Sequence, residues 1–136
     1  MNMAAPAMYV NPGQTNRMSR PLVDQSATSE DRNFAVAMHL SPFASLIGPF
    51  PWAFLVPLVL WIIRKERSAF NDDHGREIIN YGLSLLILHV LLAVSIIGIL
   101  AIPVLWVIAV VSLIRASVAA SRGEYFRYPM TWRFLS

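Results

Sequence analysis

Two long stretches of this sequence carry no charged residue: residues 34–63 and residues 78–114 contain no Asp, Glu, Lys or Arg. A helix that crosses the ~30 Å hydrocarbon core of a membrane needs about 20 apolar residues, and both stretches exceed that length. Only 14% of the chain is charged, against about 25% in soluble domains. The sequence therefore predicts an all-α membrane protein and argues against a soluble enzyme, a nucleic-acid-binding domain or a disordered chain.

Each apolar stretch contains a break that divides it into two helices. Residues 48–51 read Gly-Pro-Phe-Pro, and prolines that lack an N–H and restrict the preceding residue end a helix. The second stretch divides between Gly98 and Pro103, because proline suits the first turn of a new helix. Pro42 and Pro57 are expected to kink the first hairpin, which is short for a bilayer. We expect four transmembrane helices in two hairpins, at about 33–48, 51–65, 74–99 and 103–121.

The basic residues predict the orientation of these helices. All 11 Lys and Arg residues fall in the N-terminal segment, in the 64–76 loop, or in the segment from Arg115 onward. The turns at 48–52 and 98–103 carry none. Because basic residues accumulate on the cytoplasmic side, four spans would place both termini in the cytoplasm. We therefore expect a multi-pass protein of the bacterial inner membrane.

The two ends of the chain differ from the membrane domain expected at residues 33–122. Residues 1–32 are polar and aperiodic, which predicts a tail that is flexible or is ordered by a partner. The N-terminus lacks a basic start followed by an apolar core, so we expect the first apolar segment to direct insertion. Residues 123–136 interleave basic and aromatic residues, a pattern typical of an interfacial segment on anionic lipid.

Four motifs along residues 36–135 carry a family resemblance. They are HLS at 39–41, PLVLWIIRKERSAF at 57–70, DDHGREIINYGLSLLI at 72–87 and GEYFRYPMTWRF at 123–134. The matching positions are His39, Pro57, Trp61, Lys65, Phe70, His74, Gly75, Asn80, Tyr81, Tyr128 and Pro129. The chain resembles a family of small bacterial membrane proteins of unknown function. That family is distantly similar to the twenty-kilodalton subunit of the chloroplast inner-envelope protein-import channel. The resemblance implies a four-helix membrane domain and no catalytic activity.

His89 is the most polar residue near the middle of the third expected helix. A polar residue inside the membrane is a candidate for function. One interpretation is a neutral imidazole bonded to a serine or carbonyl of another helix, and the alternative is a haem ligand. Haem with two histidine ligands needs a second histidine at the same depth, and His39 lies much nearer its helix end. The packing interpretation is therefore favoured, and no cofactor is expected.

A second polar group is expected at the cytoplasmic interface, comprising His39, Asp72, Asp73, His74 and Asn80. His and Asp side chains at this spacing are potential metal ligands. The DDHG motif also fits the start of a helix, where acidic residues favour the positive end of the dipole. We favour the helix start and expect neither a metal nor a catalytic site.

The remaining candidates point to packing and interfaces. Arg115 can extend to the headgroups, and Ser112, Ala116 and Ala120 form a stripe of small residues suited to close helix contact. The candidate functional or interface residues are His39, Trp61, Lys65, His74, Asn80, His89, Arg115, Arg127, Tyr128 and Pro129.

These features favour a non-enzymatic role as an accessory, structural or assembly subunit of a larger membrane complex. The alternative is a protein translocation or insertion component, or a small pore. A pore needs several polar residues at mid-depth, whereas the sequence offers little beyond Ser84, His89 and Ser95. The expected partners are anionic lipids and either another membrane protein or further copies of the chain, without nucleic acid.

Overall fold

The computed structural model describes residues 21–48 and 51–136. Within these residues the fold is all-helical, and the only β-type pairing is an isolated bridge between Val23 and Glu124. The helices in chain order are α1 (Ser29–Leu40), the 3-10 helix η2 (Ser41–Leu46), α2 (Trp52–Arg64), α3 (Ala69–Ala93) and α4 (Ile96–Ser121).

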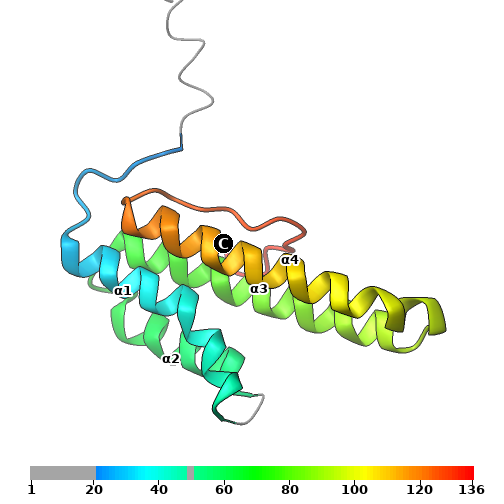
Figure 1. The fold of residues 1–136 in the computed structure, drawn as a ribbon. Helices are drawn as coiled ribbons and strands as arrows, with labels where there is room; N and C mark the ends of the chain where they lie inside the picture. The colour runs from blue at the N-terminus through cyan, green and yellow to red at the C-terminus, as the bar shows by residue number, and fades with distance from the viewer. Residues whose placement is uncertain (1–20, 49–50) are drawn as a thin grey trace, which may run out of the picture.

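The helices α3 and α4 form a long hairpin (Figure 1). They contain 25 and 26 residues, and both are long and apolar enough to cross a membrane. The turn between them lies at Val94 and Ser95, and the Ser95 side chain caps α4 by accepting a hydrogen bond from the Gly98 N–H. A Cβ atom at Gly98 would lie 2.3 Å from the Leu92 carbonyl oxygen, so glycine permits this close turn.

A shorter hairpin of α1, η2 and α2 packs against the half of the long hairpin that contains the start of α3 and the end of α4 (Figure 1). Helix α1 begins with a capping box, in which Thr28 and Asp31 bond each other's backbone N–H groups. Its Ala35 packs in the same buried cluster as Ala120 of α4, and both are completely buried. The small residues Ser112, Ala116 and Ala120 are indeed buried, as close helix packing requires.

The helix boundaries differ from those expected because local caps override the Gly and Pro signals. Helix α3 starts at Ala69, where Ser68 accepts from the Asn71 N–H, so neither Asp72 nor Asp73 caps the helix, although Asp72 lies in its first turn as an acidic residue there was expected to. Pro103 lies inside α4 and not in its first turn. The predicted first helix continues past Leu40 as a 3-10 helix, with Pro42 in its first turn. Residues 29–32 belong to α1 and not to a tail.

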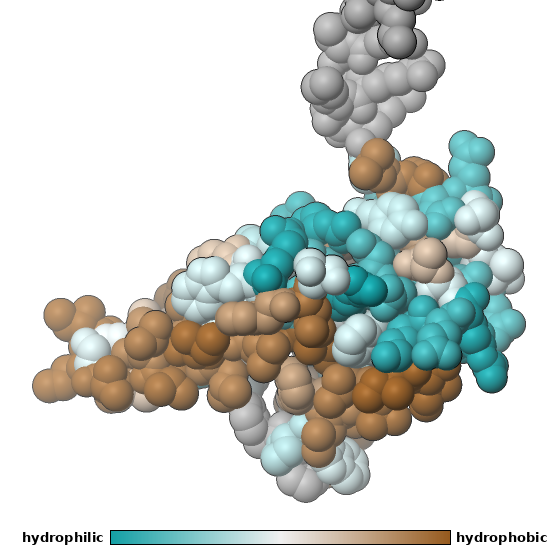
Figure 2. All heavy atoms as spheres, turned by 180° about the vertical axis from the view of Figure 1, so that it is seen from behind, coloured by the Kyte–Doolittle hydropathy of each residue, from teal (hydrophilic) through white to brown (hydrophobic). Residues whose placement is uncertain are grey.

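Two of the four predicted spans have the length of a membrane helix. Helix α2 has 13 residues, or about 20 Å at 1.5 Å per residue, against ~30 Å of hydrocarbon. Figure 2 shows apolar surface over the free end of the α3–α4 hairpin and along the shorter hairpin, with a hydrophilic region at the opposite end. The molecule therefore has an apolar body and a polar end.

Candidate functional site: a polar end covered by the C-terminal tail

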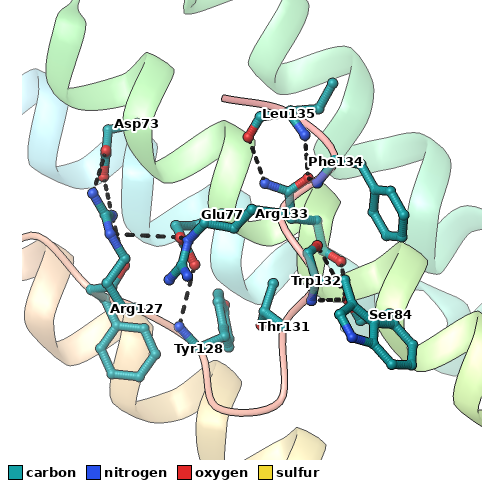
Figure 3. A network of polar contacts seen from close by, with 12 residues as sticks. Asp73, Glu77, Ser84, Arg127, Tyr128, Thr131, Trp132, Arg133, Phe134 and Leu135 are labelled. Atoms are coloured by element: carbon teal, nitrogen blue, oxygen red, sulfur yellow. Dashed lines mark hydrogen bonds and ion pairs between the residues drawn. The ribbon is translucent and has the colours of Figure 1, made fainter.

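The polar end is built on one face of α3. Glu77, Asn80 and Ser84 are spaced three and four residues apart, so they share a helix face. All three side chains are buried. The cover is residues 123–136, here called the C-terminal tail, which run back along α3 (Figure 3). Gly123, with φ of 74°, turns the chain out of α4 into this tail.

Asn80 and Ser84 hold the backbone of the C-terminal tail. The Asn80 Oδ1 atom accepts from the N–H groups of Phe134 at 3.0 Å and Leu135 at 2.8 Å. Its Nδ2 atom donates to the Leu135 carbonyl at 2.9 Å. The Ser84 hydroxyl accepts from the Trp132 N–H at 2.8 Å. These bonds satisfy backbone groups that a neighbouring β-strand would otherwise satisfy.

Glu77 lies at the centre of an ionic network (Figure 3). Its Oε1 atom is 3.0 Å from Nε of Arg133 and 3.6 Å from Nε of Arg127. Its Oε2 atom accepts from the Tyr128 N–H at 3.3 Å. Arg127 also pairs with both carboxylate oxygens of Asp73, at 2.6 and 2.7 Å. Hydrogen bonding to Asp73 raises the pKa of Arg127 above its ordinary value, so the guanidinium stays charged.

A buried chain of three side chains joins α1, α3 and the C-terminal tail. The Tyr128 hydroxyl lies 2.7 Å from Nδ1 of His39, and Nε2 of His39 lies 2.8 Å from Nδ1 of His74. A neutral imidazole has one donor and one acceptor, so a hydroxyl that donates to His39 leaves its Nε2–H to donate to His74. Tyr128 also stacks on Tyr81, with ring centroids 4.1 Å apart. Burial above all, then Tyr81 and Glu77, raise the pKa of Tyr128 well above its ordinary value.

Acidification should weaken this buried chain. His39 lies in α1, outside the two candidate spans, and burial together with the neighbouring His74 holds its pKa well below the ordinary 6.5. As the pH falls, His39 therefore takes up a proton in the unfolded state before it does so in the folded protein. The protein keeps its full free energy of unfolding above pH 6.5 and loses part of it as the pH falls toward the folded-state pKa of His39. We expect the thermal unfolding midpoint in detergent to fall between about pH 7.5 and about pH 5.

The matched variant for this prediction is His39→Gln, which removes one of the two imidazoles of the buried chain and keeps a hydrogen-bonding side chain. Its unfolding midpoint should depend less on pH in the same range. The carboxyl groups of Asp24 and Asp31 have pKa values lowered from 3.8 by hydrogen bonds, chiefly to Ser26 and Thr28, so they titrate below this window. If the unfolding midpoint changed equally with pH in the variant and the wild type, His39 would be excluded as the origin of the pH dependence.

The structure brings five of the ten candidate residues into this site: His39, His74, Asn80, Arg127 and Tyr128. Trp61 on α2 and Lys65, the C-cap residue that follows α2, lie beside it. The Trp61 Nε1–H donates to Asp72 Oδ1 at 2.9 Å, and the Lys65 ammonium lies 5.6 Å from the Trp61 ring centroid.

Of the other three candidates, His89 and Arg115 lie apart from the site, and Pro129 lies in the C-terminal tail next to Tyr128. His89 bonds the Leu85 carbonyl of its own helix at 2.7 Å, and not a group on another helix. Its ring meets Trp106 edge-on, with centroids 6.0 Å apart. Arg115 is exposed on α4, and Pro129 is exposed at a turn of the C-terminal tail.

No three or more His, Asp or Glu side chains in the described part of the chain are placed to hold a metal ion. The two ring nitrogens of His39 are both engaged, one by Tyr128 and one by His74. His39 therefore does not pair with His89 as a second haem ligand.

Sequence reasoning missed two features of the site. Glu77 was not singled out, although Glu77, Asn80 and Ser84 recur at helical spacing beside an apolar stretch, which is the available signal. The pairing of the segment before α1 with the start of the C-terminal tail was also missed. The Asp24 N–H donates to the Gly123 carbonyl at 2.8 Å, and the Tyr125 hydroxyl donates to the Asp24 carboxylate at 2.8 Å.

The comparisons with known proteins give a family. A search of curated proteins and a search of solved structures found no match. The model of the MamF/MmsF family, described as the magnetosome magnetite crystal formation protein family, matches residues 30–135. This match supports the coarser expectation of a family of small bacterial membrane proteins, and it shows no link to the chloroplast import subunit. Since the match covers most of the chain and all of its helices except the first residue of α1, this protein belongs to the MamF/MmsF family.

Proposed function

We propose that this protein is a non-enzymatic structural or assembly component of the membrane on which magnetite crystals form. The observation that carries the proposal is the division of the surface. An apolar α3–α4 hairpin suited to the bilayer is joined to a compact polar end suited to an aqueous boundary. The family description supplies the process, the formation of magnetite crystals.

The polar groups of the site support a structural role. Glu77 and Asp73 are paired with arginines, and the ring nitrogens of His39 both bond to neighbouring side chains. A general base or nucleophile needs a free position beside its substrate. These groups instead hold α1, α3 and the C-terminal tail together, which favours a scaffold over an enzyme.

A pore or translocation role finds less support. The three mid-depth polar residues expected to line a pore are each engaged locally. Ser84 bonds the backbone of the C-terminal tail, His89 bonds the Leu85 carbonyl of its own helix, and Ser95 caps α4. A polar path needs such groups turned toward a shared lumen.

We also propose that both termini face the cytoplasm. The bridge between Val23 and Glu124 places the segment before α1 beside the segment after α4. The ion pair between Glu30 and Arg64 joins the start of α1 to the end of α2. The shorter hairpin thus begins and ends at the polar end, which supports one side of the membrane for the segments before α1 and after α4. The basic residues at this end favour the cytoplasmic side and anionic lipids.

Deleting the gene in its magnetite-forming host tests this proposal. We expect crystals of altered number, size or shape by electron microscopy, with normal crystals restored by the wild type and by the surface variant Glu66→Gln. Purification in mild detergent should give a particle heavier than one chain, because an assembly component binds partners or further copies. Crystals indistinguishable from the parent strain would contradict the role in crystal formation, and a single chain by light scattering would contradict the assembly role.

A further inference from the structure

The C-terminal tail exposes three large apolar side chains. Met130, Trp132 and Phe134 are 53%, 48% and 53% exposed, although the N–H groups of Trp132 and Phe134 are hydrogen-bonded to α3. Trp132 and Phe134 alternate with Thr131 and Arg133, so an extended chain directs them toward a common side, and Met130 lies at the turn just before them. Large apolar side chains in this pattern would not stabilise a segment that faced only water.

These side chains border the apolar surface of the long hairpin. The Trp132 N–H is bonded to Ser84 of α3, and Ile87 and Leu91, three and seven residues further along the same helix face, are exposed apolar residues. The charged groups lie toward the other end of α3, where Glu77 binds Arg133. The apolar surface therefore continues from the candidate spans onto the C-terminal tail, with arginines at its edge.

The protein itself satisfies part of the backbone in and beside this segment. Glu77, Asn80 and Ser84 accept from the N–H groups of Tyr128, Trp132, Phe134 and Leu135. Irregular backbone is tolerated at membrane depth only where such partners replace water. The polar face of α3 provides such partners for the N–H groups of Trp132 and Phe134, which suits a segment in the interfacial layer beside the lipid.

Met130 adds an independent observation. Its φ of 54° lies in the left-handed region, which favours glycine and penalises a side chain with a Cβ atom. A turn exposed only to water would accommodate glycine more easily. A long apolar side chain at this position is explained if that side chain has an apolar environment.

We propose that residues 129–134 form a membrane anchor that inserts into the interfacial layer of the bilayer beside α3. Met130, Trp132 and Phe134 contact the acyl-chain boundary, and Arg127 and Arg133 lie among anionic headgroups. Tryptophan and arginine are typical of this layer. The inference rests on the proposed membrane placement of the α3–α4 hairpin, and it is independent of the role in crystal formation.

Site-directed spin labelling tests the anchor directly, because the chain contains no cysteine. Full-length Met130→Cys and Phe134→Cys are labelled with a nitroxide and reconstituted in vesicles of equal parts phosphatidylcholine and phosphatidylglycerol. Glu66→Cys, on an exposed loop, is the water control, and Leu91→Cys, on the exposed face of α3, is the lipid control. The ratio of oxygen to nickel-chelate accessibility should be several-fold higher at 130 and 134 than at 66.

The other outcomes overturn the anchor. A ratio at 130 or 134 equal to that at 66 would mean that the segment is solvated. Low accessibility to both reagents would mean that protein, such as a second copy, covers it. A water-like ratio at 91 would overturn the membrane placement of the hairpin together with the anchor, whereas a lipid-like ratio at 91 with a water-like ratio at 130 overturns the anchor alone.

Discussion

Replacing Glu77 with glutamine should detach the C-terminal tail from α3 and lower the free energy of unfolding by about 2 kcal/mol. The Glu77 side chain is only 5% exposed, and it bonds Arg133, the Tyr128 N–H and, more loosely, Arg127. Removing one member of a buried ion pair costs about 3–5 kcal/mol, but both arginines are half-exposed and recover hydration, which reduces the loss.

Limited trypsin digestion measures the release of the tail, since Arg127 and Arg133 become accessible once the backbone is free. We expect faster cleavage at these two sites in Glu77→Gln, together with a lower thermal unfolding midpoint in detergent. Glu66→Gln is the matched control, because it makes the same change on an exposed loop. Cleavage rates and midpoints equal to those of the control would contradict the central role of Glu77.

The helical class of the fold followed from the sequence, but several helix ends did not. Long charge-free stretches exclude most alternatives to membrane helices, so two helices were expected where α3 and α4 lie. Their junction was placed about six residues too late, and the expected fourth helix was shorter than α4, because Ser95 caps α4 ahead of the Gly98 and Pro103 signals. Caps depend on a single side chain, and apolar periodicity does not indicate which serine is used.

The candidate site could be predicted residue by residue but not as a cluster. His39, His74, Asn80 and Tyr128 were singled out, yet Tyr128 and His39 are 89 positions apart in the chain. Their meeting depends on how the C-terminal tail lies along α3, and an extended segment has no helical periodicity to indicate which face it covers. Its hydrogen bonds involve mainly its backbone, which is the same for every sequence.

Substituting Gly75 by alanine should have the other large effect, a loss of about 2 kcal/mol in the free energy of unfolding. Gly75 is buried on α3 against Trp61 of α2, and an added Cβ atom would lie 2.0 Å from Cδ1 of that ring. Trp61 cannot move freely, because its Nε1–H donates to Asp72 at 2.9 Å. Overpacking costs about 1–3 kcal/mol, and the lost hydrogen bond adds about 1 kcal/mol. The better helix propensity of alanine offsets about 1 kcal/mol of this total.

Gly82→Ala is the matched control on the same helix. Its added Cβ atom would lie 3.2 Å from the Phe54 ring, a contact that a small shift relieves, so the gain in helix propensity should leave stability unchanged or slightly higher. Thermal unfolding of the two variants in the same detergent separates steric conflict from propensity. Adding Trp61→Leu to Gly75→Ala should restore part of the loss, since the two positions interact directly. If Gly75→Ala proved as stable as Gly82→Ala, the close packing of α2 on α3 at Trp61 would be wrong, and with it the position of the shorter hairpin.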